Sequence, residues 1–511
     1  MNRILPLLLS FMLILSMLAG CDQGENPYAP TGNALHDSTA NTVSPPVSKD
    51  QQLTLVYYPD RSMNPYTATD FTNRALFPLM YQSLFSIDRN YNVIPILCQK
   101  YSVSADMRTY TIYPEPAAFS DGATLTAADV AASLQAAKSG QYYAGRFQHI
   151  TGITAEADRV IITLDTPMEN LPLLLDIPIV KASEVNASNP LGTGPYIFEE
   201  APGGKRLRRT SYWWCRSDLV VTATYIPLAE GKSPNQIRDQ FEFSDLGLVC
   251  ADPGSDTYAD YRCDYELWDI ENGIFLYLVS NAKSRVFSNT AVRAALTHAI
   301  NRDYLVETFY RGFARSATLP ASPLSPFYDI TLAEHYDYDT AVFADAISAA
   351  GFENASVTLL LNADDTLRLR AGRAIADMLS SCGLTVTTLE VNSIQFMEHL
   401  KAGDYDLYLG QTRLSANMDL TAFFTQNGGL NYGGLTDTTA YAMCLEALAN
   451  TGNYYNLHKE VMDKGQLCPI LFRSYAVYAT RGLVTKLSPA RDNMFYYSIG
   501  KTLADAKVSQ S

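Results

Sequence analysis

Residues 356–409, SVTLLLNADDTLRLRAGRAIADMLSSCGLTVTTLEVNSIQFMEHLKAGDYDLYL, decide the fold. Three runs rich in Val, Leu, Thr and Tyr have the pattern of strands, and the two longer runs between them have the apolar spacing of helices. We expect strands at Ser356–Asn362, Leu384–Val391 and Tyr405–Leu409, and helices at Thr366–Leu379 and Ile394–Leu400. Strands that alternate with helices form parallel sheets. The stretch therefore predicts a βαβαβ unit and an α/β fold.

The residues directly after the third strand are the first candidate for a ligand site. Ligands of open α/β sheets bind outside the carboxyl ends of the strands, and Gly410-Gln411-Thr412-Arg413 follows Tyr405–Leu409. The guanidinium of Arg413 could hold a carboxylate through two parallel hydrogen bonds. A surface ion pair is the alternative interpretation of this arginine, and the sequence leaves both open.

The chain before this unit mixes strands and helices. Thr126 lies three residues before Asp129, which is the spacing of a capping pair at a helix start. The glycines and prolines of Pro190–Phe198 (PLGTGPYIF) favour a hinge or crossover. A phosphate loop would require a strand before it and a helix after it, and the sequence indicates neither. We expect strands at Leu53–Tyr58, Thr109–Tyr113 and Ile274–Val279, a hairpin of Ile150–Ala155 with Val160–Leu164, and helices at Asn73–Phe85, Ala127–Lys138, Asn289–Ala299 and Arg302–Phe309.

The first fifty residues have the pattern of a secretion signal followed by a linker. Arg3 precedes an apolar run, Ile4–Met17, and Leu18-Ala19-Gly20-Cys21 looks like a bacterial lipobox. That resemblance implies cleavage after residue 20 and a lipid on the thiol of Cys21. The apolar run is shorter than the roughly 20 residues of a membrane span. Residues 22–50 are rich in Asn, Pro, Ser, Thr and Gly, so we expect a disordered linker.

Composition bounds the function classes. The 511 residues allow two or three domains, and the net charge of −15 argues against nucleic acid as a partner. The six histidines are scattered, with none spaced as metal ligands on one helix, so we expect no metal and no cofactor. Beyond Cys21 the cysteines form no C-x-x-C pair, and Cys250 with Cys263 is the one bridge that the spacing suggests.

Several stretches together resemble one family. They are FSDGATLTAADV (119–130), NPLGTGPYIF (189–198), LRRTSYWW (207–214), SNTAVRAALTHAINRDYLVETFYRG (288–312), TVTTLEVNSIQFMEHLKAGDYDLYLG (385–410) and NYGGLTD (431–437), together with the lipobox. Their order and spacing resemble the extracytoplasmic solute-binding proteins of ABC importers, in the oligopeptide, dipeptide and nickel-binding family. The resemblance runs from about Leu53 to near the C-terminus.

The resemblance implies a periplasmic-binding-protein-like (type II) clamshell with two α/β lobes and an extra domain. Lobe I would comprise residues 51–88, 186–272 and 475–505. The extra domain would be 89–185, and lobe II would be 273–474. A solute would lie between the lobes, and permease subunits of an ABC transporter would receive it. A lipid on Cys21 would hold the protein on the outer face of the membrane, and we expect a monomer.

Two positions depart from the family pattern. In peptide-binding members an aspartate shortly after the glycine of the YDLYLG-like strand holds the amino group of the ligand. Aligning Asp419 with the acidic residue that usually follows places Ala416 at that position. With alanine there, recognition of a free amine would need another partner. At the second position, Asn301 replaces the usual Asp before Arg302, which changes a helix cap.

The first functional hypothesis is a receptor that captures a solute, with an oligopeptide as first choice of ligand. The alternatives are a nickel or metallophore receptor, a sensory peptide receptor without transport, and a surface hydrolase. The hydrolase lacks support because neither G-x-S-x-G nor H-E-x-x-H occurs. The predicted ligand-binding residues are Tyr58, Asn64, Gln411, Thr412, Arg413, Asn431, Tyr432 and Tyr475, with no catalytic and no metal-binding residue.

Overall fold

The computed structural model describes residues 52–215, 219, 221–426, 429–434, 437–484, 487–491 and 493–497, and the backbone of 507–510. The predicted signal peptide, Cys21 and the linker to Asp50 lie outside these residues, so their assignments stay predictions. Among the described residues, no helix combines the length and the apolar character that crossing a bilayer requires.

The βαβαβ prediction is confirmed. Strand β16 (Ser356–Asn362) lies between β17 (Thr385–Val391) and β18 (Leu407–Arg413), and pairs with both in parallel. The connecting helices are α10 (Thr366–Ser381) and α11 (Ser393–Ala402). Each begins where a side chain accepts a hydrogen bond from a backbone amide of the first turn, Asp365 from Arg368 and Asn392 from Gln395.

One boundary in this unit differs from the expectation. Residues Gly410–Arg413 do not form a loop after the strand; they are the second half of β18. The reason is a neighbour that local sequence does not reveal. Strand β14 (Glu266–Ser280) pairs with the whole length of β18, with Ile274 opposite Arg413 and Ser280 opposite Leu407.

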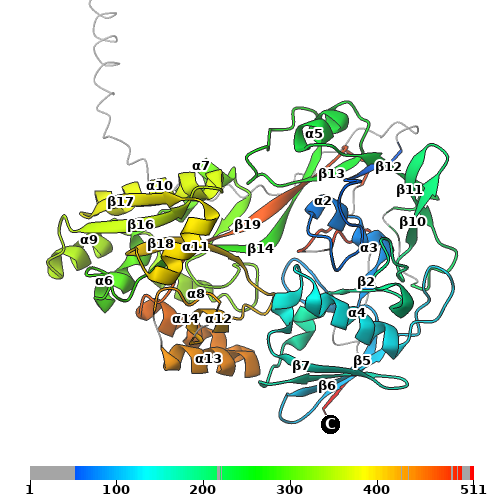
Figure 1. Cartoon of the computed structure of the whole chain (residues 1–511), viewed down its shortest axis with the longest axis horizontal. Coiled ribbons are helices and arrows are strands. Elements are labelled where there is room, and N and C mark those ends of the chain that lie inside the picture. The colour runs from blue at the N-terminus through cyan, green and yellow to red at the C-terminus, as the bar shows by residue number, and fades with distance from the viewer. Residues whose placement is uncertain are drawn as a thin grey trace, which may run out of the picture.

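Strands β14 and β19 (Cys468–Ala479) connect two halves of the molecule (Figure 1). They pair antiparallel with each other, and a bulge interrupts the pairing between Glu271 and Phe275. The sheet order is β13 (Leu248–Ala251), β19, β14, β18, β16 and β17, with β15 (Ala314–Ser316) also on β19. The predicted lobe borders after 272 and 474 fall within these two strands, and the division into lobes stays a prediction.

We call the elements from β1 to β13, together with β20 (Lys507–Gln510), the first body, and those from α6 to α14 the second body. In Figure 1 the second body lies on the left and the first body on the right. The second body holds β16–β18 and the helices α6 (Thr290–Ala295), η4 (Leu296–Ala299), α7 (Arg302–Tyr310), α8 (Ile330–Ala333), η5 (Glu334–Tyr336), α9 (Thr340–Ala349), α10, α11, α12 (Thr421–Phe424), α13 (Thr438–Ala449), η6 (Thr451–Asn453) and α14 (Tyr454–Asp463).

The first body contains a four-stranded and a five-stranded sheet. The four-stranded sheet has the order β1 (Leu55–Tyr57), β12 (Tyr225–Glu230), β11 (Gly204–Arg209) and β10 (Tyr196–Ala201). The five-stranded sheet has the order β20 (Lys507–Gln510), β5 (Cys98–Val103), β6 (Thr109–Pro114), β8 (Val160–Leu164) and β7 (Ile150–Ala155). Two short pairs join β2 (Gln82–Ser83) to β9 (Pro178–Ile179), and β3 (Phe85–Ile87) to β4 (Val93–Pro95).

The helices of the first body include one correction. The predicted helix Asn73–Phe85 is wrong: α2 (Phe71–Arg74) and α3 (Phe77–Met80) replace it, and the chain then enters β2. Pro78 has no amide hydrogen and fits only the first turn of a helix, so a new helix starts there. The capping pair is confirmed, because Thr126 and Asp129 exchange both hydrogen bonds at the start of α4 (Ala127–Ser139). The remaining helices are η1 (Ala144–Phe147), η2 (Leu171–Leu174), η3 (Ala182–Glu184) and α5 (Pro234–Glu242).

The hydrophobic cores are shared across the junction of the two bodies. Ile87, Tyr91 and Leu173 of the first body belong to the same buried cluster as Phe275 of β14 and Phe423 of the second body. A buried side chain of this size contributes about 1.5–3 kcal/mol. Cys250 and Cys263 are both free thiols, so the suggested bridge between them is not formed.

Candidate functional site

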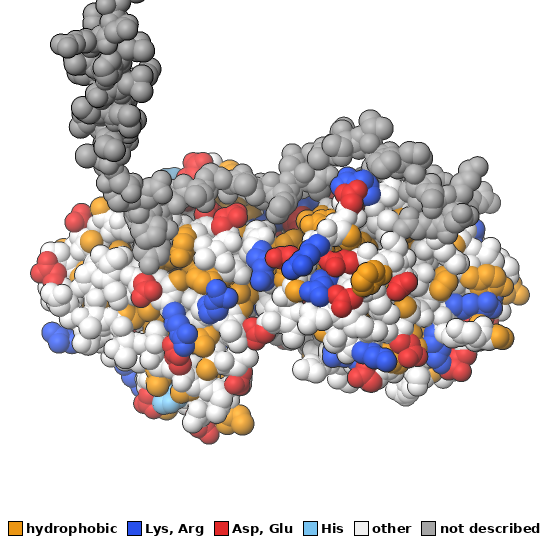
Figure 2. Space-filling view, turned by 90° about the horizontal axis from the view of Figure 1, so that it is seen from above, with side chains coloured by type: hydrophobic (Ala, Val, Ile, Leu, Met, Phe, Trp, Pro, Cys, Tyr) orange, Lys and Arg blue, Asp and Glu red, His pale blue; other side chains and the backbone are white. Residues whose placement is uncertain are grey.

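Two adjoining cavities lie beside strand β19 and at the junction of the bodies. The first, of about 580 Å³, is the first-body chamber; it is lined by Tyr58, Asp70, Phe71, Asp252, Tyr258 and Tyr475, among others. The second, of about 500 Å³, is the junction chamber; it is lined by Tyr142 and Gln148 of the first body, by Thr412, Arg413 and Asp419 of the second, and by Arg491, among others. Thr69 lines both chambers. Figure 2 shows Lys and Arg side chains gathered with carboxylates near the middle of the molecule.

The wall of the first-body chamber is aromatic. The rings of Phe71 and Tyr475 stack, with centroids 4.0 Å apart and an angle of 23° between the planes. Phe71 is the first residue of α2, which begins at Asp70 because that carboxylate accepts hydrogen bonds from the amides of Thr72 and Asn73. Burial raises the pKa of the Tyr475 phenol, so the ring stays neutral. The stack offers a flat apolar face to a solute.

An ion pair forms the floor beside this stack. Arg473 Nη2 of β19 lies 3.0 and 3.1 Å from the carboxylate oxygens of Asp252, at the end of β13, and Nη1 donates to Gln411 Oε1 of β18 at 3.4 Å. Burial lowers the pKa of the Arg473 guanidinium, but Asp252 and neighbouring groups raise it more. A Cβ at Gly254 would lie 2.1 Å from Nη2, so only glycine allows this approach. Arg473 thus connects the middle of β19 to the end of β13 and to β18.

Arg413 spans the junction chamber. Its guanidinium lies 4.4 Å from the ring centroid of Tyr142, which belongs to the first body, while Arg413 ends β18 of the second body. Both Arg413 and Tyr142 also interact electrostatically with Tyr475. The two chambers therefore adjoin at one group of aromatic and cationic side chains from both bodies.

A buried network supports the opposite side of the junction chamber. Arg491 Nη2 donates to the carbonyl of Leu414 at 3.2 Å and Nη1 donates to the Tyr91 hydroxyl at 3.1 Å. That hydroxyl in turn donates to Glu271, next to the bulge of β14. Burial raises the pKa of Glu271, although its hydrogen bonds and the nearby arginines oppose this. The network connects the chamber wall to the strand that links the bodies.

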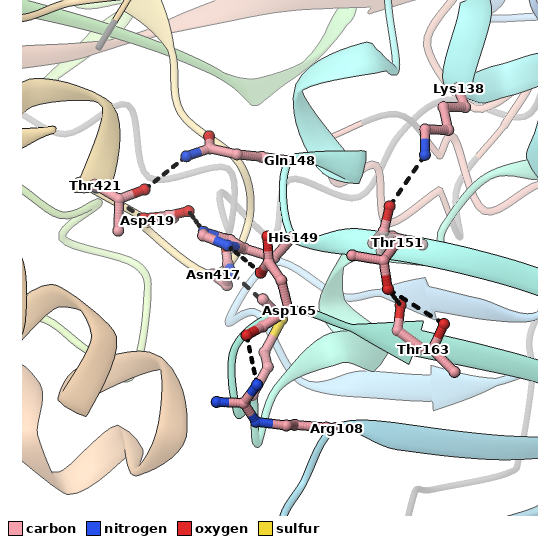
Figure 3. Close-up of polar contacts among 12 residues, drawn as sticks. Arg108, Lys138, Gln148, His149, Thr151, Thr163, Asp165, Asn417, Asp419 and Thr421 are labelled. Carbon is pink, nitrogen blue, oxygen red and sulfur yellow. Dashed lines mark hydrogen bonds and ion pairs between the residues drawn. The ribbon is translucent and has the colours of Figure 1, made fainter. Parts of the chain in front are cut away.

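His149 and Gln148 of the first body reach the second body at the rim of the junction chamber (Figure 3). His149 Nε2 lies 3.2 Å from Asp419 Oδ2, and Gln148 Nε2 donates to Thr421 Oγ1 at 2.8 Å. Asp419 is the carboxylate among the described residues that line this chamber. A ligand group that reaches Asp419 therefore meets a carboxylate that already has a partner.

The structure brings four of the eight predicted ligand residues to these chambers. Tyr58 and Tyr475 line the first-body chamber, and Thr412 and Arg413 line the junction chamber. Gln411 lies next to them through its hydrogen bond with Arg473. Their role in binding stays a prediction.

The other three predicted residues make local contacts elsewhere. Asn64 Nδ2 donates to the carbonyls of Val185 and Ala187, and the residue lines a separate groove on the first body. Asn431 Nδ2 donates to the carbonyl of Thr425. Tyr432 packs against Tyr408. The structure does not place these three side chains with the other five.

Sequence reasoning missed Thr69, Phe71, Tyr142, Asp252 and Arg473. Phe71 had a local signal, because Asp70 directly before it can cap a helix, but the short helix was placed too late in the chain. Tyr142, Asp252 and Arg473 carry no pattern that separates them from packing residues. Ala416 is buried, so the position where the family pattern has an aspartate faces the core. Among the described residues, no three His, Cys, Asp or Glu side chains could hold a metal.

A family comparison agrees with this architecture. The profile of bacterial extracellular solute-binding proteins, family 5 (Middle), matches residues 92–433. The chain belongs to this family. The expectation drawn from the sequence motifs is confirmed at that level.

Relatives within family 5 are distant. The glutathione-binding protein GsiB of Pectobacterium atrosepticum is 26% identical over 317 residues, and that of Escherichia coli K12 is 26% identical over 319 residues. Each match covers 58% of this chain and spans 61% of the length of the curated relative.

Solved structures of other solute-binding proteins share the fold. HbpA2 of Haemophilus parasuis superposes with a TM-score of 0.74 at 17% identity, over 88% of this chain and 99% of that one. NikA of Brucella suis, in complex with Fe(III)-EDTA, gives 0.69 at 18% identity, over 88% and 100%. AppA of Bacillus subtilis, in complex with a nonapeptide, gives 0.59 at 19% identity, over 88% and 99%. The family 5 chain therefore has the α/β fold of type II periplasmic binding proteins.

Proposed function

We propose that this family 5 protein is a lipid-anchored extracytoplasmic receptor that captures an oligopeptide between its two bodies and delivers it to the permease of an ABC transporter. The observation that carries the proposal is the pair of adjoining chambers, whose walls come from both bodies. A solute that contacts both bodies favours the conformation in which they approach each other.

The shape and chemistry of the chambers favour a peptide. The Phe71–Tyr475 stack supplies apolar area, and Arg413 supplies a planar cation that can hold a carboxylate with two hydrogen bonds. The chambers measure about 580 and 500 Å³, which is the volume range of sites that bind small molecules. Such a volume suits a short peptide. Similar proteins include a glutathione-binding protein and an oligopeptide-binding protein in complex with a nonapeptide.

The second candidate is a solute whose charge is carried by carboxylates, such as a metal chelate or metallophore. The observation that favours it is the state of the lining carboxylates. Asp252 pairs with Arg473, Asp419 with His149, and Asp70 with Arg61 while also capping α2. A ligand ammonium would have to displace one of these partners, whereas an anionic ligand would be attracted by Arg413 and Arg491, which line the junction chamber.

The place of action and the partner rest on the N-terminal pattern and on the family. A lipid on Cys21 would hold the protein at the outer face of the cell membrane, with residues 22–50 as a linker. A sensory receptor without transport would use the same chambers and differ only in its partner. A surface hydrolase has less support, since the family is one of solute-binding proteins.

Native mass spectrometry of the purified full-length protein tests the proposal, because it can detect a solute retained from the cell. Calorimetric titration with S-methylglutathione, tri- to nonapeptides and a nickel–histidine complex then ranks the ligands. Small-angle scattering should show a smaller radius of gyration with the tightest ligand. Failure of every solute class to bind, or unchanged dimensions with a bound ligand, would contradict the proposal.

A further inference from the structure

The side chain of His149 lies between two carboxylates from different bodies (Figure 3). Its Nδ1 is 3.0 Å from Asp165 Oδ1 of the first body, and its Nε2 is 3.2 Å from Asp419 Oδ2 of the second. Asp419 Oδ1 accepts a hydrogen bond from the amide of Thr421 at the start of α12. His149 is thus a direct polar link between the two bodies.

This geometry fits only one protonation state of the imidazole. Neutral histidine has one ring nitrogen that donates and one that accepts. A neutral His149 would therefore face a carboxylate with a lone pair on one side. The imidazolium donates on both sides, and it also neutralises Asp419, whose side chain is only 9% exposed. A buried carboxylate without such a partner would be costly.

The electrostatic surroundings agree with the geometry. Burial lowers the pKa of His149, but the hydrogen bonds and charges of Asp419 and Asp165 outweigh it, so the pKa is raised above its ordinary value. On the first body, Arg108 donates to the backbone carbonyl of Asp165, and Arg146 of η1 pairs with Asp176. On the second body, Cys444 and Tyr454 lie near Asp419, and burial raises the pKa of both, so they stay neutral.

The described neighbouring links between the bodies contain no other histidine. Gln148 donates to Thr421, and the amide of Glu169 donates to the carbonyl of Leu448. The Glu169 carboxylate accepts from the amide of Thr451. Histidine is the side chain whose ordinary pKa lies between pH 5 and 8. Among these described links, His149 is the one histidine.

We propose that His149 is a proton-operated clasp: its imidazolium joins the first body to the second through Asp419, and its deprotonation loosens the joined conformation and weakens solute binding. The consequence for binding rests on the proposed function, because it requires that capture and approach of the bodies are coupled. The consequence for conformation does not.

The direction of the pH effect follows from the raised pKa. A group whose pKa is higher in the joined form stabilises that form fully below its ordinary pKa. The stabilisation disappears as the pH rises through the raised pKa. The joined conformation is therefore favoured on the acid side of neutrality and declines toward about pH 8.

Pulsed electron–electron double resonance on the full chain, without ligand, tests the clasp. Spin labels on unnatural amino acids at Ala157, in the exposed β7–β8 turn, and at Ile394, exposed on α11, report the distance between the bodies. We expect the population with the short distance to fall at least about twofold between about pH 5.5 and about pH 8. In His149→Gln this change should vanish, because glutamine can donate a hydrogen bond but carries no charge.

Two further variants make the result specific. Asp419→Asn removes the negative charge that the imidazolium faces on the second body and should abolish the same change, so the test survives if one variant fails to fold. His399→Gln is the matched control, since His399 lies 3.8 Å from Asp404 within the second body alone, and it should respond like the unaltered protein. A distance that is independent of pH in the unaltered protein, or a response that persists in both His149→Gln and Asp419→Asn, would overturn the clasp.

Affinity for S-methylglutathione, whose sulfur is a thioether and cannot ionise, separates this inference from the proposed function. If the probe binds, we expect its Kd to rise at least about threefold over the same pH interval, and to change less than about 1.5-fold in His149→Gln. A bound probe with a pH-independent Kd would overturn the coupling. If no probe binds while the distance still responds to pH, the ligand assignment fails and the conformational clasp stands.

Discussion

Phe71 and Tyr475 stack on each other although they come from opposite ends of the chain. Phe71 is held at the start of α2, and Tyr475 by the pairing of β19 with β14, opposite Ile270. Because both residues line the first-body chamber, the stack depends on the complete sheet and also forms a surface that a solute can contact.

Replacing one ring of this stack should weaken binding. Tyr475→Ala removes an aromatic face worth about 0.5–1.5 kcal/mol, so we expect a roughly two- to twelvefold higher Kd for the best-bound peptide. Tyr475→Phe keeps the ring and should bind nearly as well. Tyr455→Ala, at a half-exposed position on α14, is the control and should leave the calorimetric Kd unchanged. Equal affinities for Tyr475→Ala and Tyr455→Ala would remove the stack from the site.

Removing Arg413 should weaken binding more strongly. Its guanidinium lies over Tyr142 in the junction chamber, where a charge-assisted hydrogen bond to a ligand carboxylate contributes about 1.5–3 kcal/mol. Arg413→Ala should therefore raise the Kd at least about tenfold, without loss of folding by circular dichroism. Arg373→Ala removes an exposed arginine paired with Glu390 and serves as the control. Near-native affinity of Arg413→Ala would show that Arg413 does not contact the ligand.

Neutralising Asp252 should destabilise the fold. Asp252→Asn leaves the guanidinium of Arg473, which is 8% exposed, without its counter-ion. An uncompensated buried charge of this kind costs about 1–3 kcal/mol, so the midpoint of urea unfolding should fall. Asp264→Asn breaks an ion pair with Arg481 in which the aspartate is 69% exposed, and should change the midpoint little. Equal midpoints for both variants would contradict a stabilising role of the Asp252–Arg473 pair.

A methyl group at Gly194 should disturb the packing of the PLGTGPYIF segment. An added Cβ would lie 2.5 Å from the carbonyl carbon of Met80 and 2.7 Å from the carbonyl oxygen of Leu79, both backbone atoms. Relief of such overlap requires a backbone shift, which costs about 1–3 kcal/mol. Gly194→Ala should lower the unfolding midpoint, whereas Gly429→Ala, with open space around it, should not. An unchanged midpoint for Gly194→Ala would mean that the segment relaxes freely.

The same segment shows how far sequence reasoning reached. Its two glycines indicated an unusual backbone path, and the structure supplies the reason, since Gly192 and Gly194 both lie against the backbone of Met80. The partner could not be predicted, because the composition of a turn does not encode which distant element, here helix α3, lies beside it. The helix expected over Asn73–Phe85 failed for a related reason: its apolar residues serve two short helices and two strands that face different neighbours.

For the candidate site, the sequence predicted the carboxyl-end half of β18, Tyr58 directly after β1 and Tyr475 within β19. It could not separate Gln411, Thr412 and Arg413 from Asn431 and Tyr432, because both groups are polar or aromatic residues near predicted turns. Burial and hydrogen bonding distinguish them, since Asn431 bonds to the nearby carbonyl of Thr425 while Arg413 lies against Tyr142 of the other body.

The sequence by itself determined the local elements: the βαβαβ alternation of 356–409, the capping pair of Thr126 with Asp129, and the hairpin of β7 with β8. These follow from periodicity and from hydrogen bonds between residues a few positions apart. Only the tertiary structure decided that Phe71 meets Tyr475 and that His149 meets Asp419. Such contacts join residues hundreds of positions apart, and the long pairing of β14 with β19, which no local pattern encodes, fixes where the two bodies come together.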